Sequence, residues 1–461
     1  MTTRRRIGIA LATMVALLIV ALLIVAGIGR SAWRRAQEPK YEGRTAGEWL
    51  DELAARSPDG MMMDELAQKE GEIVFRNLGV AGRRFLVRDY LSYEWPSDFR
   101  TNLFARGEKL PARLRPKFLR SPVPRAVACS EVLNLIRPEW EVFQPEVGGA
   151  FAAGGERALA ATILLGYVGR GSTNAALLLV SSLTNAAPRG RMIALQALGD
   201  LKTNSAPALP TLLSWVHQWS PGTPVQGGDK MVLHAIAASG EQASAALDKL
   251  DQLFVASVQP ADQLELATAL LRIKPDHTAA FALLEAQLSS GTNQSKNGPG
   301  VVLLNILWRK GPPNPAFSRL ASRLIDSRTD WFHAAQIMLR NDPPAGVAAL
   351  HQKLANQRFD TEAIGVLDLL LRHDPRDAVA LAFLDAQMGD GFFPRNRLRT
   401  LIVPTYRHCL PDSPGVVELL KSIQPAQDDE ALRKAIRETL RHIELNGKLK
   451  ELRERDDARQ R

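Results

Sequence analysis

Cysteine is scarce in this sequence, and long alternating β-patterns are lacking. The only cysteines in 461 residues are Cys129 and Cys409, which excludes a disulfide-stapled scaffold and a cysteine-rich zinc module. The two lie 280 residues apart, so we expect buried free thiols rather than a mutual disulfide. Hydrophobic residues make up 46% and charged residues 23% of the chain, which excludes general disorder. Few strands are expected, because no segment shows the period-two pattern.

Catalytic and metal-binding motifs are also missing. The chain contains no H-E-x-x-H, C-x-x-C or G-x-S-x-G, and its Gly154-Gly155 pair precedes Glu156 and Arg157 where a phosphate loop needs Lys and Ser or Thr. The glycines at 148–149 and 154–155 therefore indicate a flexible linker between repeats. A zinc site would need distant histidines to converge, because they are scattered singly, at His217, His234, His277, His333, His351, His373, His408 and His442. We predict no catalytic residue, no metal, no cofactor and no enzymatic activity.

One long uncharged run stands near the N-terminus. Ile7 to Ile28 is 22 residues without a charge, after the short tail 1–6. A helix of that length covers about 33 Å, enough for a hydrocarbon core of about 30 Å. We predict an uncleaved single-pass signal anchor at 7–28; a cleaved signal peptide and a buried core helix are the alternatives. Basic residues flank both ends, but a six-residue tail stays inside more easily, which favours the N-terminus in the cytoplasm and residues 41–461 outside. In a bacterium, the anchor would then lie in the inner membrane and residues 41–461 in the periplasm.

The net charge belongs mainly to the flanks of this run. The first 40 residues carry seven basic and one acidic residue, and so supply +6 of the formal +9. The remaining +3 leaves the bulk of the chain nearly neutral. The composition therefore argues against nucleic acid as a partner.

Internal repeats set the expected fold. Residues 270–291 and 370–391 are identical at ten of 22 positions, and the offset of 100 is about three units of 33 residues. Further units begin at Ala161, Ala194, Leu233, Leu304 and Ala335, and each is a helix, a short turn and a second helix. In the unit at Ala194, the second helix carries an i, i+3, i+4, i+7 apolar stripe, at Leu209, Leu212, Leu213 and Val216. Stacking would cover the face that one pair cannot bury alone. We predict an all-α fold, an α-solenoid of antiparallel helix pairs preceded by one transmembrane helix.

These units resemble HEAT repeats of the short bacterial type. The likeness rests on Ala194 to Gly199 (ALQALG), on Ala206 to Pro210 (APALP), and on R-x-x-A at Arg125/Ala128, Arg157/Ala160 and Arg191/Ala194. It covers about 156–425 and is weaker over 64–150. The opening at Tyr41 to Thr45, with Glu48-Trp49-Leu50, is similar to that of certain membrane-anchored bacterial HEAT-repeat proteins. The resemblance implies a right-handed scaffold that binds other proteins. Later units replace the Leu-Gly step with LLR-x-x-P, and tetratricopeptide repeats, which share the period, are the alternative.

The predicted organisation places the irregular parts at both ends. A second unusual region runs from Arg83 to Arg125, where eleven basic and four acidic residues are interleaved with aromatics. We expect it to be a solvated insertion, partly neutralised by the net −5 of residues 41–82.

The predicted segments are a tail at 1–6, a transmembrane helix at 7–28, a juxtamembrane linker with the first helix at 29–63, degenerate repeats at 64–155 with a basic Pro-rich insertion at 96–125, regular repeats at 156–425, a capping helix at 426–446 and a charged tail at 447–461.

Three functional hypotheses follow. The first is a membrane-tethered scaffold for protein partners of unknown identity. The second is an enzyme of the HEAT-like lyase type, which a deep pocket with a strongly perturbed acid or histidine would favour. The third is binding to a polyanion or anionic lipid through the basic insertion. Its candidate contacts are Arg113, Arg115, Lys117 and Arg120.

Overall fold

The chain folds almost entirely into helices. A computed structural model describes residues 37–56, 62–92, 123–136, 140–169, 172–185, 188–290, 313–326, 330–355, 360–389, 402–413, 415–423 and 429–460. These residues form twenty α-helices, three 3₁₀ helices and one short antiparallel hairpin that pairs Lys40–Tyr41 with Arg44–Thr45. The prediction of an all-α, many-helix chain of the helical-repeat kind is confirmed.

The membrane component of the predicted fold class is wrong. Among the described residues, no helix combines the length and the apolar character needed to cross a membrane. The segment 7–28, to which the prediction referred, lies outside the described residues.

The chain divides into two compact units, one of residues 1–90 with 96–136 and the other of 91–95 with 137–461. In the first unit, α2 (Ala46–Ala55) and α3 (Glu65–Asn77) pack on α6 (Val123–Ile136), and α4 (Gly79–Leu91) follows α3. Helix α2 begins at a capping box, in which Thr45 accepts from the Glu48 N–H while the Glu48 carboxylate accepts from the Thr45 N–H. Local sequence thus sets where the first helix starts.

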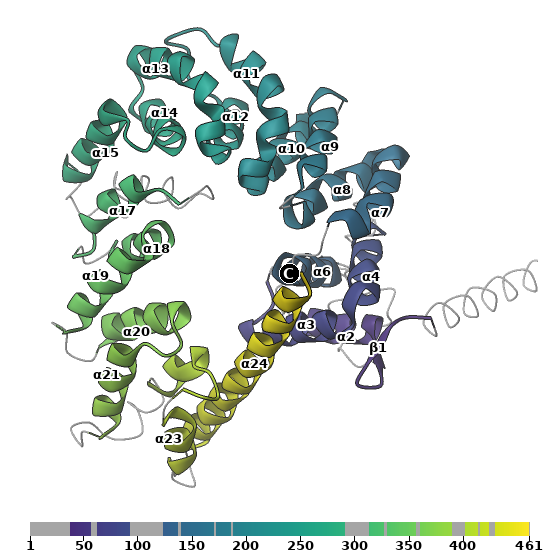
Figure 1. Cartoon of the computed structure of the whole chain (residues 1–461), viewed down its shortest axis with the longest axis vertical. Coiled ribbons are helices and arrows are strands. Elements are labelled where there is room, and N and C mark those ends of the chain that lie inside the picture. The colour runs from purple at the N-terminus through teal and green to yellow at the C-terminus, as the bar shows by residue number, and fades with distance from the viewer. Residues whose placement is uncertain are drawn as a thin grey trace, which may run out of the picture. The chain divides into compact units, whose positions relative to one another are not determined.

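The second unit begins with consecutive helix pairs. In Figure 1 the first helix of each pair packs on the first helix of the next pair. These four helices are α8 (Gly155–Val168), α10 (Pro188–Leu201), α12 (Gly227–Ala238) and α14 (Pro260–Ile273). Their partners are α9 (Thr173–Asn185), α11 (Leu209–His217) with the 3₁₀ helix η3 (Lys202–Ala208), α13 (Leu247–Ala256) with η4 (Gly240–Ala246), and α15 (Thr278–Ser290). Helix α7 (Trp140–Ala153) packs on α8.

The same arrangement continues after residue 312. The pairs are α18 (Trp331–Asn341) with α19 (Pro343–Ala355) and α20 (Thr361–His373) with α21 (Ala378–Gly389), after the single helix α17 (Pro315–Ser322). The unit ends with η5 (Val403–His408), α23 (Val416–Ser422) and α24 (Glu430–Gln460). Below, α8, α10, α12, α14, α18 and α20 are called the first helices.

The repeat at an offset of 100 residues is reproduced bond for bond. The Lys274 N–H donates to the Leu270 carbonyl at 2.7 Å, and the Asp374 N–H donates to the Leu370 carbonyl at the same distance. Both Lys274 and Asp374 have extended backbone conformations that end their helices. The turns of two distant pairs therefore have one geometry, as the shared sequence predicts.

Apolar side chains fill the space between the pairs. In α11 the predicted stripe is largely confirmed, since Leu209, Leu212 and Val216 are buried, while Leu213 is half-buried. Each fully buried leucine contributes about 1.5–3 kcal/mol to folding. Among the first helices, α14 keeps its whole central part, Leu264 to Ile273, in the core. The pairs are thus held together mainly by their neighbours.

Two local predictions differ from the structure. Gly148 and Gly149 lie inside α7 rather than in a flexible linker, and the chain breaks only at Gly154, whose φ of +70° favours glycine. The segment 447–461, predicted as a charged tail after a capping helix at 426–446, continues α24 as far as Gln460. It does so because Leu445, Leu449 and Leu452 extend the buried stripe, while Lys448 pairs with Glu444 on the outer side.

Candidate functional site

The predicted polyanion contacts cannot be placed. Arg113, Arg115, Lys117 and Arg120 all lie in 93–122, outside the described residues, so their role stays a prediction. The last basic residue of the same region, Arg125, is described and sits in α6. It pairs with Asp89 at 2.9 Å and with Asp51. Although burial disfavours the cation, the hydrogen bond and charge of Asp89 raise the pKa of Arg125. This arginine is neutralised within the first unit.

Neither thiol has the surroundings of a nucleophile. Cys129 and Cys409 are both buried free cysteines. Burial raises the pKa of Cys409 to about 12 and raises the pKa of Cys129 well above its ordinary value. The described residues also contain no group of three or more His, Cys, Asp or Glu side chains that could hold a metal ion.

Each first helix has one position that is always apolar and buried and another at which the residue type varies. The residue three positions before the last residue of each helix is always apolar and buried. These residues are Leu165, Leu198, Ala235, Leu270, Met338 and Leu370. The penultimate residue itself changes from helix to helix, through Tyr167, Asp200, Ala237, Arg272, Arg340 and Arg372. One turn earlier the residue varies as well, through Ile163, Gln196, Leu233, Thr268, Gln336 and Asp368. Packing explains the uniform position and the buried Leu233 and Ala237, but not exposed residues such as Gln196 and Arg372.

We call this variable surface the first-helix face: the side chains of the first helices that lie outside the hydrophobic core. It includes exposed residues such as Met192 and Gln196 on α10, Met231 on α12 and His333 on α18. Because residues i and i+4 share one side of a helix, α10, α14, α18 and α20 each contribute a polar or charged group to this side, whereas α12 contributes the apolar Leu233 and Ala237. The face therefore differs in chemistry along the chain while the backbone repeats.

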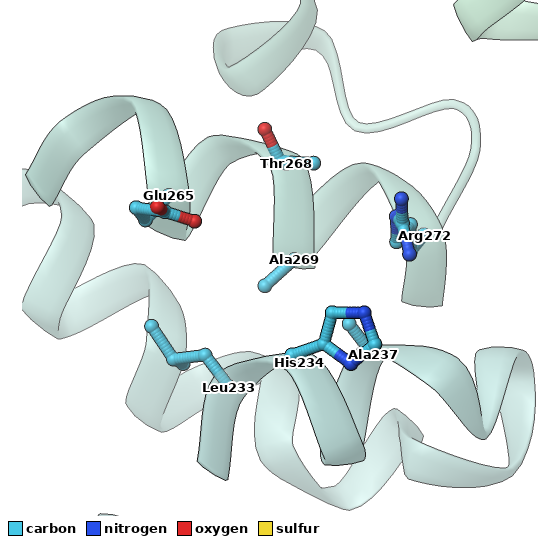
Figure 2. Close-up of a pocket in the computed structure, with 7 residues that line it drawn as sticks. All are labelled: Leu233, His234, Ala237, Glu265, Thr268, Ala269 and Arg272. Atoms are coloured by element: carbon cyan, nitrogen blue, oxygen red, sulfur yellow. The ribbon is translucent and has the colours of Figure 1, made fainter. Parts of the chain in front are cut away.

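A small pocket opens on this face between α12 and α14 (Figure 2). Glu265 and Arg272 lie at its two ends on α14, with Thr268 and Ala269 between them. Its empty volume is about 250 Å³, much of which is the open mouth, so the enclosed part is far smaller than a typical small-molecule site. Three of its polar side chains are nonetheless deeply placed, since Glu265, Thr268 and Arg272 are at most 9% exposed. The pocket has room for one functional group of a larger partner.

Neighbouring residues give the pocket its form. His234 of α12 lies against Gly199 of α10, and a methyl group at 199 would come within 2.6 Å of the His234 Cε1 atom. Glycine at 199 therefore makes room for the imidazole. The guanidinium of Arg272 stands over the ring of Phe317 at 5.6 Å from its centroid, which ties the pocket to α17. Ala237, which lines the pocket opposite α14, leaves space because its side chain is small.

A charged cluster lies further along the same face. Asp368 on α20 accepts from Arg372 at 3.1 Å, from Arg407 at 2.6 Å and from His408 at 2.9 Å. Burial acts to raise the pKa of Asp368, but the hydrogen bond from His408 and the charges of Arg407 and Arg372 hold that pKa below its usual value. The carboxylate is therefore ionised at neutral pH and fixes two guanidinium groups.

Sequence reasoning singled out none of the pocket residues. His234, Glu265, Thr268 and Arg272 match no catalytic motif, and each looks like an ordinary helix residue when it is taken alone. The available signal was the recurring LLR or MLR step that ends with Arg272, Arg340 and Arg372. It was noted only as a departure from the repeat pattern.

Comparisons with known proteins add no family. No protein-family model matches the chain, and no curated protein is similar to it. One similar solved structure is the crystal structure of an engineered protein, at 12% sequence identity, with 86% of this chain and 98% of that chain covered and a TM-score of 0.21. A TM-score this low supports no conclusion about fold or function.

Proposed function

We propose that the protein is a scaffold of the HEAT-repeat kind that binds a protein partner along its first-helix face. The observation that carries the proposal is the contrast between two positions of each first helix. The core position is apolar in all six helices, whereas the penultimate position runs through tyrosine, aspartate, alanine and arginine. A surface of this type supports recognition of an extended partner, since each repeat reads a different part of it.

The pocket supports binding in preference to catalysis. It is small, and its charged groups, Glu265 and Arg272, stand two helical turns apart on one helix. Such a pair suits the docking of a polar side chain from a partner, with a carboxylate placed near Arg272 or a cation near Glu265. The lyase-type enzyme hypothesis called for a deep pocket, and the described residues supply no observation in its favour. The predicted location of the protein stays a prediction.

Site-specific photocrosslinking in cells tests this proposal. A photoreactive amino acid replaces Gln196 or His333 on the first-helix face of the full-length protein, and matched controls replace Ser214 on α11 or Gln252 on α13. All four side chains are exposed, so the replacements should leave the fold intact. We expect both first-helix positions to capture one and the same protein. Capture from Ser214 and Gln252 alone, or no protein adduct from any of the four positions, would contradict the proposal.

A further inference from the structure

Apolar side chains gather on the first-helix face of three consecutive pairs. Met192 of α10 and Met231 of α12 are 51% and 38% exposed, although large apolar side chains usually lie in the core. Because residues four apart share one side of a helix, the apolar residues of α8 on this face form a single row. The half-buried apolar residues beside the two methionines are Leu159, Ile163 and Tyr167 of α8 and Ile193 of α10. We call these six residues the apolar band.

The three helices that carry the band are in direct contact, since α8 packs on α10 and α10 packs on α12. A methyl group at Gly166 of α8 would lie 3.3 Å from the Cα atom of Ala197 on α10, so these two helices approach closely. The band therefore forms one surface across three helices. Along α8 it extends from Leu159 to Tyr167, eight residues or about 12 Å, which is close to the width of an α-helix with its side chains.

One flank of the band carries exposed arginines. Arg157 of α8 and Arg189 and Arg191 of α10 lie within the first four residues of their helices. Among the described residues, no acidic group pairs with any of the three. The N-terminal end of a helix carries a partial positive charge, so cations are disfavoured there, and α10 has no acidic residue in its first turn. Asp200 lies at the other end of α10, and Glu146 lies two turns from the end of α7 that joins α8.

The acidic groups at the same helix ends leave this flank positive. In the described part of the chain, Glu156 is the acidic residue at the N-terminal ends of α8 and α10. On α12, Asp229 is matched by the adjacent Lys230, and on α14 both Asp262 and Glu265 are buried. Three exposed arginines therefore stand beside one exposed glutamate. A carboxylate of a partner would find a net attraction on this flank.

We infer that the apolar band binds an amphipathic helix of the partner protein, with acidic residues along the flank that faces the arginines. The inference rests on the proposed function and specifies the chemistry of the partner. Packed helices lie about 8–10 Å apart, and residues i and i+7 of an α-helix are about 10.5 Å apart. Apolar side chains at i, i+7 and i+14 would therefore meet α8, α10 and α12 in turn. Methionine suits such a surface, because its flexible side chain adapts to the groups that pack on it.

The test is a binding titration of the full-length protein, followed by fluorescence anisotropy. The probe is a labelled helical peptide of about 18 residues, with a leucine stripe that repeats at i, i+3 and i+7, glutamate on one flank of the stripe, and alanine or glutamine elsewhere. A second peptide has lysine in place of glutamate, and a third has the same composition in an order that forms no stripe. The protein variants are Met192→Ser, Met231→Ser and Arg189→Gln. Circular dichroism of each variant checks the fold.

Two control variants match these changes at exposed positions away from the band. Leu177→Ser removes an apolar side chain of α9 that is 55% exposed. Lys274→Gln removes an exposed cation in the turn after α14. Both should leave the affinity for the glutamate peptide unchanged.

We expect the glutamate peptide to bind the wild type, and each of Met192→Ser and Met231→Ser to weaken binding about fivefold, because a half-exposed methionine loses its burial under the peptide. Arg189→Gln should weaken binding about threefold at low salt and less at high salt. The lysine peptide and the peptide without a stripe should bind more weakly.

Three results would overturn the inference. They are equal affinities of the wild type and both methionine variants, an equally tight complex with the lysine peptide, and binding to phosphatidylcholine vesicles that the methionine variants lose, since the band would then contact lipid. If one protein is captured at Gln196 and His333 while the glutamate peptide fails to bind, the scaffold proposal stands and this inference falls.

Discussion

A pair of swapped residues offers a sharp test of the repeat architecture. His277 at the start of α15 contacts Asp251 of α13, with 2.8 Å between Nε2 and Oδ1. One hundred residues later, His351 of α19 contacts Asp377 just before α21, also at 2.8 Å. The two pairs occupy equivalent positions, but histidine and aspartate have changed places. Each contact joins the second helix of one pair to the turn of the next.

The local geometry sets the expected cost of losing the contact. His277 also caps α15, because its Nδ1 atom accepts from the Ala280 N–H at 3.2 Å, as the Asp377 carboxylate does from the Ala380 N–H at 2.9 Å. Replacing His277 with alanine should cost about 1 kcal/mol for the cap and about 0.5–1 kcal/mol for the partly exposed contact with Asp251. The total of about 2 kcal/mol is large enough to measure.

The informative variant exchanges the two residues, Asp251→His with His277→Asp. Because the other pair already uses this arrangement, the double variant should be within about 0.5 kcal/mol of the wild type. The single changes place two histidines or two carboxylates together and should each cost about 1 kcal/mol. Urea denaturation followed by circular dichroism gives the free energies of unfolding. A double variant as unstable as the sum of the single ones would refute the equivalence of the two repeats.

Three further predictions concern individual buried or half-buried side chains. Gly199→Ala should destabilise the protein by about 1–3 kcal/mol, because the new methyl group displaces the His234 ring, and His234→Ala in the same chain should recover most of that loss in urea denaturation; no recovery would show that the clash lies elsewhere. Asp368 has a lowered pKa in the folded state, so its contribution to stability is present above its unfolded pKa of about 3.9 and is lost as the pH falls through the folded value; Asp368→Asn should flatten the difference in urea midpoint between pH 6 and pH 3, and an unchanged pH dependence would contradict the assignment. Cys129 and Cys409 should react with iodoacetamide slowly in the folded protein and fast in urea, as followed by mass spectrometry, because burial keeps both thiols protonated; fast native labelling would contradict their burial.

The repeat pattern allowed the helix pairs to be predicted, because their boundaries depend on local signals. The LLR-x-x-P step ends α14 and α20 with the same hydrogen bond, and apolar spacing identifies the stripe of α11. The extent of α24 was missed because the many charges after Asn446 hid a buried stripe at Leu449 and Leu452. The glycines at 148–149 suggest a linker, yet they lie inside α7, because a glycine costs a helix only about 1 kcal/mol and the adjacent Val147 and Ala150 are buried.

The candidate site was less predictable for a different reason. The pocket depends on residues from two helices that are more than thirty positions apart, such as His234 and Arg272, and on the small side chain of Ala237 opposite α14. No spacing rule within one helix brings them together. The charged cluster around Asp368 likewise depends on Arg407 in η5, whose contact with Asp368 spans 39 positions. Tertiary packing, not local pattern, creates both.

Side-chain footprinting with hydroxyl radicals tests the central claim most directly. The full-length protein is labelled alone and in complex with the partner captured by crosslinking. Met192 and Met231, which are 51% and 38% exposed on α10 and α12, should become protected by the partner. Leu177 on α9 and Val255 on α13, which are 55% and 82% exposed, should label equally in both samples. Protection of Leu177 and Val255 with unchanged labelling of Met192 and Met231 would contradict binding along the first-helix face.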